Sequence, residues 1–156
     1  MAESSDRRVV AVAVDGSDYS EHAFDWYLQK IRKDKDKVEF IHVTEPPSLP
    51  VFSLKSGIGA PTEQWGEIMK KKLEEVGKLE DGFSFKAQGA KVEYKFHHIP
   101  NESAGPGIVA KAKACNAELI IMGTRGQNKV RRTILGSVSD YVLHHAGIPV
   151  AVVPPN

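Results

Sequence analysis

The chain has 156 residues, and 21 Lys and Arg against 20 Asp and Glu leave a formal net charge of +1. That length fits one domain around one core, and 41% apolar with 26% charged residues argues against disordered, collagen-like or fibrous architectures. A net charge so close to zero provides no long-range attraction for nucleic acid or an anionic membrane, so we expect neither as a partner.

The amino terminus predicts no targeting segment. Residues 1–8 are polar, and only six apolar residues follow, too few for the core of a signal peptide or for a membrane span. Cys115 is the single cysteine, so the chain can form no internal disulfide and nothing indicates an oxidising compartment. We therefore expect a cytoplasmic protein with residues 1–8 as a flexible tail and residues 9–154 as its one domain.

The first third of the chain predicts a strand, a helix and a second strand. Residues 9–14 form a continuous, Val-rich apolar run that ends in Asp-Gly-Ser, which is typical of a strand buried on both faces. Apolar residues then recur at helical spacing from Ser17 or Asp18 to Ile31. Residues 38–43 predict the second strand, and the Pro- and Gly-rich residues 46–61 predict an irregular surface loop.

The rest of the chain continues this alternation. A long helix is expected from a cap at Thr62, with one apolar stripe facing the core: Trp65, Ile68, Met69, Leu73, Val76 and Leu79. The later elements are strands over 91–99, 118–122 and 148–153, a helix over 107–116, and a helix from Ser137 that Gly147 stops. Five strands alternating with four helices predict one α/β domain with a doubly wound, Rossmann-like parallel sheet. Such sheets bind ligands at the carboxyl ends of the strands, where the strand order reverses.

A spaced glycine motif follows the fourth predicted strand. Gly123, Gly126, Gly136 and Ser137 read Gly-x2-Gly-x9-Gly-Ser, and Ser137 opens the last helix. Glycines let the backbone approach a ligand closely, and the free amides and dipole at a helix amino terminus attract phosphate. The charged residues between Glu118 and Asp140 are all basic: Arg125, Lys129, Arg131 and Arg132. These residues predict a phosphate-binding loop. The alternative is structural: Gly123 ends a strand, Gly126 makes a turn and Ser137 caps the helix, while the basic side chains form a solvated face.

Asp15 follows the first predicted strand directly. A carboxylate beside a bound phosphate group is repulsive unless a cation lies between them, so Asp15 is a candidate ligand for Mg²⁺. The alternative is that Asp15 only shapes the turn before the first helix.

The glycine motif resembles the ATP-binding signature of the universal stress protein family. Four more segments resemble the family in its order: Val12–Ser17, Ile41–Val43, Leu119–Gly123 and Ile148–Val153. The resemblance implies the Rossmann-like fold of adenine nucleotide alpha hydrolases, with ATP and Mg²⁺ as ligands. Arg125 belongs to the basic loop, and the resemblance places these further residues around the nucleotide: Ala13, Asp15, Val43, Met122, Gly123, Gly126, Gly136, Ser137, Val138 and Ser139. The family often has proline where this chain has Ala13. This difference weakens only the nucleotide contact that the resemblance implies for Ala13.

The resemblance also implies a function. It indicates an ATP-binding module for signalling in stress response, with slow or no hydrolysis, since in the phosphate loop only Gln127 is a candidate to orient an attacking water. A weak Mg²⁺-dependent ATPase that uses Asp15, or a nucleotide-free dimeric scaffold, are the alternatives. Family members commonly dimerise through their last strand, so we expect a homodimer through residues 148–153, an apolar edge.

Two further features of the sequence indicate structural roles. His97 and His98 are adjacent on a predicted strand and therefore point to opposite faces, so the pair does not predict a metal site. Cys115 lies on an Ala-rich helix with no base nearby in the sequence, which predicts a core-packing residue.

Overall fold

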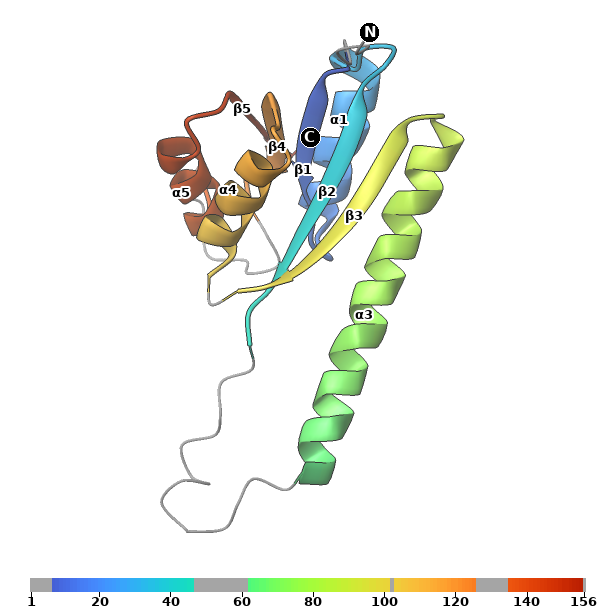
Figure 1. Ribbon diagram of the computed structural model, residues 1–156, viewed down its shortest axis with the longest axis vertical. Coiled ribbons are helices and arrows are strands. Elements are labelled where there is room, and N and C mark those ends of the chain that lie inside the picture. The colour runs from blue at the N-terminus through green and yellow to red at the C-terminus, as the bar shows by residue number, and fades with distance from the viewer. Residues whose placement is uncertain (1–6, 47–61, 102, 126–134, 156) are drawn as a thin grey trace, which may run out of the picture.

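The computed structural model describes residues 7–46, 62–101, 103–125 and 135–155. Their elements are β1 (Val9–Ala13), α1 (Asp18–Lys30), β2 (Lys37–Thr44), α3 (Thr62–Gly89), β3 (Glu93–Pro100), α4 (Ala104–Ala114), β4 (Leu119–Gly123), α5 (Ser137–His145) and β5 (Val150–Val153). The five strands pair in parallel in the order β3-β2-β1-β4-β5 (Figure 1). The predicted α/β fold with a doubly wound parallel sheet is confirmed.

The sheet is covered on both faces, which explains why β1 is apolar at every position. Val10 and Val12 belong to the core on the α1 and α3 side, whereas Ala11 and Ala13 belong to the core on the α4 and α5 side. Successive side chains of a strand alternate between the two faces, so a strand with two covered faces needs no polar positions. The core contains Phe24, Phe40 and Phe83 on one side, and Ile108, Ile120 and Val142 on the other.

Helix α3 is longer than the sheet that it covers. Its 28 residues span about 42 Å, whereas the 8 residues of β3 span about 26 Å, and the amino-terminal half of α3 continues past the end of β3 (Figure 1). The predicted core stripe is therefore wrong in this half: Ile68, Met69 and Leu73 are 46%, 45% and 59% exposed. Val76 is buried and Leu79 packs against the core, as predicted.

Part of the predicted tail is bound to the domain. Arg8 donates hydrogen bonds to the carboxylate of Asp36, and Arg7 forms an ion pair with Glu93 at 2.5 Å. The rest of the tail, and residues 47–61 of the predicted surface loop, lie outside the described residues. In the part of the chain that the structure describes, no helix has both the length and the apolarity that a membrane span requires.

Candidate functional site

The strand order reverses at β1, which lies between β2 and β4. The helices that follow β1 and β4, which are α1 and α5, pack on opposite faces of the sheet. Sheets of this kind bind ligands at the carboxyl ends of the strands at such a point. The chain places predicted site residues at this edge from three neighbouring strands: Ala13 ends β1, Gly123 ends β4 after Met122, and Val43 precedes the last residue of β2. The structure thus brings together residues that lie far apart in the sequence.

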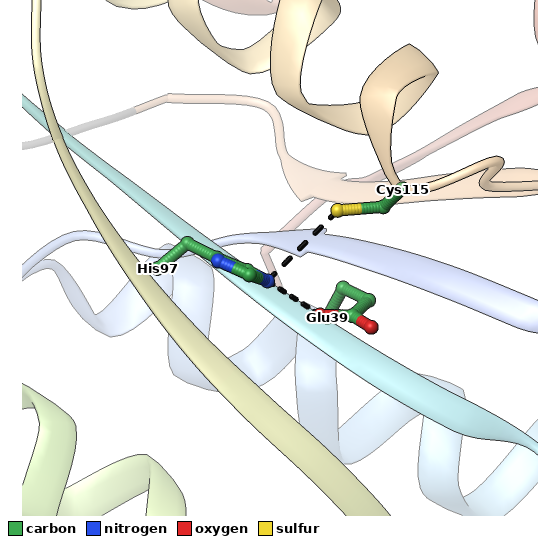
Figure 2. A group of neighbouring side chains, drawn as sticks. All are labelled: Glu39, His97 and Cys115. Carbon is green, nitrogen blue, oxygen red and sulfur yellow. Dashed lines mark hydrogen bonds and ion pairs between the residues drawn. The ribbon is translucent and has the colours of Figure 1, made fainter.

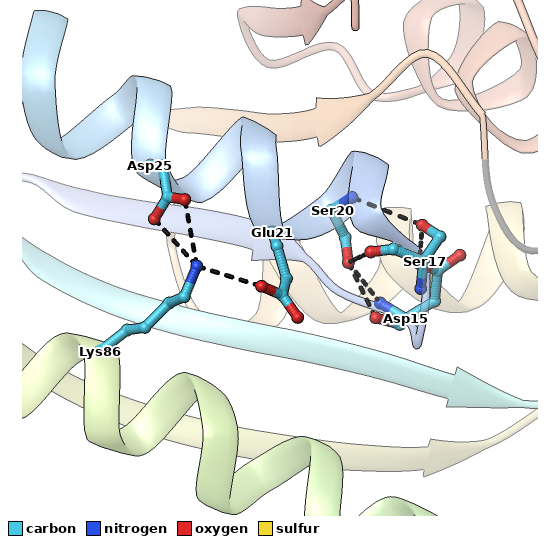
Figure 3. Close-up of polar contacts among 6 residues, drawn as sticks. All are labelled: Asp15, Ser17, Ser20, Glu21, Asp25 and Lys86. Carbon is cyan, nitrogen blue, oxygen red and sulfur yellow. Dashed lines mark hydrogen bonds and ion pairs between the residues drawn. The ribbon is translucent and has the colours of Figure 1, made fainter.

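Asp15 shapes the turn between β1 and α1. Its Oδ1 accepts hydrogen bonds from the backbone N–H of Ser17, at 2.9 Å, and from the Ser17 hydroxyl (Figure 3). Ser17 is the N-cap of α1, and the Ser20 hydroxyl donates to the Asp15 carbonyl at 2.8 Å. Within the described residues, Oδ2 of Asp15 has no hydrogen-bond partner. The turn role is therefore observed, and it leaves one carboxylate oxygen for a cation.

His42 lies beside this turn and was not predicted as a site residue. Its Nδ1–H donates to the carbonyl of Val14 at 2.9 Å, and its ring stacks on that of His98 with the ring centres 6.0 Å apart. Burial lowers the pKa of His42, although the bond to Val14 opposes this, so the ring is neutral at pH 7. Val38 and Phe40, the two even positions of β2 before His42, are both apolar. A histidine at the next position of this alternating series was the sequence signal that could have identified it.

Gly123 allows α1 to pack against the end of β4. A Cβ atom at this position would lie 2.8 Å from both the Cβ and the carbonyl oxygen of Tyr19, closer than such atoms can approach. Close packing against Tyr19 therefore requires glycine at position 123, independently of any contact with a ligand.

Gly123→Ala is expected to lower the free energy of unfolding by about 1–3 kcal/mol, because α1 must shift to admit the methyl group. Urea unfolding followed by circular dichroism measures this change. Gly77→Ala is the matched control: a Cβ there meets nothing within 4 Å, so it should stabilise α3 by about 0.5–1 kcal/mol. Equal stability of Gly123→Ala and wild type would contradict the packing argument.

The carbonyl of Thr124 closes the base of the glycine loop. It accepts a hydrogen bond from the N–H of Gly136 at 2.7 Å, and the hydroxyl of Ser139 lies 3.0 Å from it. Ser139 is only 2% exposed, and its hydroxyl joins the start of α5 to Thr124 at the end of β4. A Cβ at Gly136 would lie 3.1 Å from the same carbonyl. The loop residues Gly126, Lys129, Arg131 and Arg132 lie outside the described part of the chain.

Helix α5 begins at this loop base without a capping side chain. Its N-cap is Gly136, which makes no side-chain cap bond, and Ser137 at the first helical position is exposed. The first N–H groups of a helix have no acceptor within the helix, and they carry the positive end of its dipole. The amides of Ser137, Val138 and Ser139 therefore have no acceptor within the helix and can donate to an anion next to the end of β4, where Arg125 also lies.

The comparisons with known proteins agree on one family. The model of the universal stress protein family matches residues 6–154. Universal stress protein YxiE of Bacillus subtilis is 28% identical over 142 residues, which are 91% of this chain and 95% of YxiE. Two plant relatives are longer, and this chain spans 64% and 62% of their lengths.

Solved structures share the fold. A family protein from Arabidopsis thaliana with AMP bound has a TM-score of 0.68 at 18% identity, with 96% of this chain and 92% of that chain covered. A universal stress protein in complex with cAMP has a TM-score of 0.64 at 18% identity, with 94% and 96% covered.

Proposed function

The chain belongs to the universal stress protein family, and from this premise we propose that it binds ATP with Mg²⁺ at the carboxyl edge of β1 and β4. The observation that carries the proposal is the amino terminus of α5, which offers backbone amides and no capping side chain beside the end of β4. Family members of the same fold that were solved with AMP and with cAMP support an adenine nucleotide as the ligand class.

We assign the parts of the nucleotide to residues along this edge. The phosphates would be held by the amides of the α5 first turn and by the basic loop, with these residues: Arg125, Gly126, Gly136, Ser137, Val138 and Ser139. The adenine would lie against Val43, and the ribose near Ala13, Met122 and Gly123. Mg²⁺ prefers oxygen ligands and is usually bound by one or two carboxylates together with phosphates and water. Oδ2 of Asp15, which has no hydrogen-bond partner among the described residues, fits that donor set.

We propose binding with slow or no hydrolysis, in which the bound nucleotide regulates a partner during stress. A hydrolase needs a side chain that orients or deprotonates water. At the base of the glycine loop, the described residues Thr124, Arg125, Leu135 and Gly136 include no carboxylate, amide or imidazole side chain that could do this.

The nucleotide test begins with wild-type protein. We expect denatured protein to release an adenine nucleotide that chromatography identifies, and the emptied protein to bind Mg·ATP in calorimetry. Gly126→Asp would place a carboxylate among the phosphates and should abolish that binding. If no nucleotide is released and Mg·ATP does not bind to the emptied wild type, the proposed function is wrong.

We further propose a homodimer through β5. This strand lies at the edge of the sheet next to β4, so one side of its backbone has no strand partner in the described fold. Such an apolar edge favours pairing with a second copy. Light scattering after gel filtration should give twice the chain mass of 17.1 kDa at micromolar concentration. A species with the mass of one chain would contradict the proposed dimer.

The cytoplasmic location remains a prediction from the sequence.

A further inference from the structure

Three side chains with metal-ligating atoms meet on the face of the sheet that α4 covers. They come from separate elements: Glu39 from β2, His97 from β3, and Cys115 from the carboxyl end of α4 (Figure 2). The Glu39 and His97 side chains are 5% and 11% exposed, and Cys115 is partly exposed. A carboxylate is costly to bury, so Glu39 at this position calls for a compensating partner.

The spacing of the three ligand atoms suits a small cation. His97 Nε2 lies 2.5 Å from Glu39 Oε2 and 3.9 Å from Cys115 Sγ, and all three atoms lie within 4.8 Å of one another. Tetrahedral zinc separates a thiolate sulfur and an imidazole nitrogen by about 3.6 Å, and a nitrogen and a carboxylate oxygen by about 3.4 Å. The sulfur is thus almost in place, and the His97–Glu39 contact would open by about 1 Å to admit the ion.

Lys37 forms an ion pair with the Glu39 carboxylate. Its Nζ lies 2.7 Å from Glu39 Oε1, which leaves Oε2 directed toward His97. The ion pair with Lys37 therefore holds the Glu39 carboxylate in one orientation, as partners behind metal ligands generally do.

We propose that Glu39, His97 and Cys115 form a site for a borderline transition metal such as Zn²⁺, with a fourth position open to water. The donor set decides the class of metal, since imidazole and thiolate favour Zn²⁺ whereas Mg²⁺ and Ca²⁺ require oxygen. The site is separate from the nucleotide edge: Glu39 is the third residue of β2, and Cys115 lies where α4 leads back toward the start of β4. A bound ion would fasten β2, β3 and α4 together.

The test uses purified full-length protein without nucleotide. Co²⁺ bound to a thiolate gives a charge-transfer absorption band, and because the chain has one cysteine, the band reports Cys115 alone. We expect this band, one Zn²⁺ bound per chain in competition with a chromophoric chelator, and protection of Cys115 by Zn²⁺ against iodoacetamide. The protection measurement needs no variant, so it does not depend on how a substitution affects folding.

Substitutions test which side chains bind the ion. Cys115→Ser, His97→Gln and Glu39→Gln should each weaken Zn²⁺ binding by at least about tenfold. His98→Gln is the matched control, because His98 is adjacent in sequence, faces the opposite side of β3 beside His42, and should leave binding unchanged. The proposal is overturned if Co²⁺ gives no thiolate band, if two chains share one ion, or if Zn²⁺ binds Cys115→Ser and His97→Gln as it binds wild type.

Discussion

Ser137→Asp is expected to weaken the binding of Mg·ATP by at least about 100-fold while leaving the fold intact, because like charges brought together at a binding site cost several kcal/mol. Ser137 is the first residue of α5 and is exposed, so the new carboxylate would stand at the helix amides proposed to hold phosphate. The same carboxylate interacts favourably with the helix dipole, worth about 0.3–1 kcal/mol, so the free energy of unfolding should stay unchanged or rise.

The measurement pairs calorimetry of Mg·ATP binding with urea unfolding of the same samples. Ser137→Ala is the matched control: it removes the hydroxyl without adding charge, and it should bind far more tightly than Ser137→Asp. If Ser137→Asp binds Mg·ATP as tightly as wild type, the phosphates do not lie at α5. If its stability falls instead, the weaker binding reports unfolding.

Asp36→Asn is expected to lower the free energy of unfolding by about 3–5 kcal/mol, because it removes one partner of a buried ion pair. The Asp36 side chain is 1% exposed, and Arg8 donates to it from Nε at 2.9 Å and from Nη2 at 2.6 Å. The Tyr27 hydroxyl and the Lys33 N–H also donate to Oδ2, at 2.7 and 2.9 Å. An amide offers one acceptor oxygen and turns an N–H₂ group toward these donors, and it leaves Arg8 without a counter-charge.

The same residue predicts a dependence of stability on pH. Burial would raise the pKa of Asp36, but the hydrogen bonds from Arg8, Lys33 and Tyr27 outweigh it and hold the pKa below its usual value. A carboxyl whose pKa is lower in the folded state stabilises the protein above its unfolded pKa of about 3.9, and this contribution disappears as the pH falls through the folded pKa. Wild type should therefore lose more stability than Asp36→Asn between pH 7 and the acid range.

Urea unfolding at neutral and acidic pH checks both statements. Asp34→Asn is the matched control, since Asp34 is exposed two residues away and its substitution should change stability by no more than about 0.5 kcal/mol. An Asp36→Asn variant as stable as Asp34→Asn at neutral pH would show that the buried pair contributes little. Parallel acid profiles for Asp36→Asn and wild type would show that another carboxyl controls the pH dependence.

Much of the candidate site could be placed from local patterns. The end of an apolar strand run predicted where Ala13 and Asp15 lie, and a glycine followed by a helical pattern predicted where Gly136 and Ser137 lie, because strand ends and helix starts depend on neighbouring residues. The detailed roles could not be read in this way. The sequence does not tell that Gly123 makes room for Tyr19, or that Ser139 is buried against Thr124, since both depend on how α1 and α5 dock.

The sequence by itself determined the element types, the parallel sheet and the edge that carries the glycine motif, because each follows from periodicity or turn chemistry within a few residues. Only the tertiary structure decided which side chains meet across elements. His97 lies 58 positions from Glu39 and 18 from Cys115, and they meet because β2 pairs with β3 in one register and α4 covers that face. Exposure at Ile68 and Leu73 has the same origin: an amphipathic pattern marks a face of α3, but the length of the sheet beneath decides how much of that face is buried.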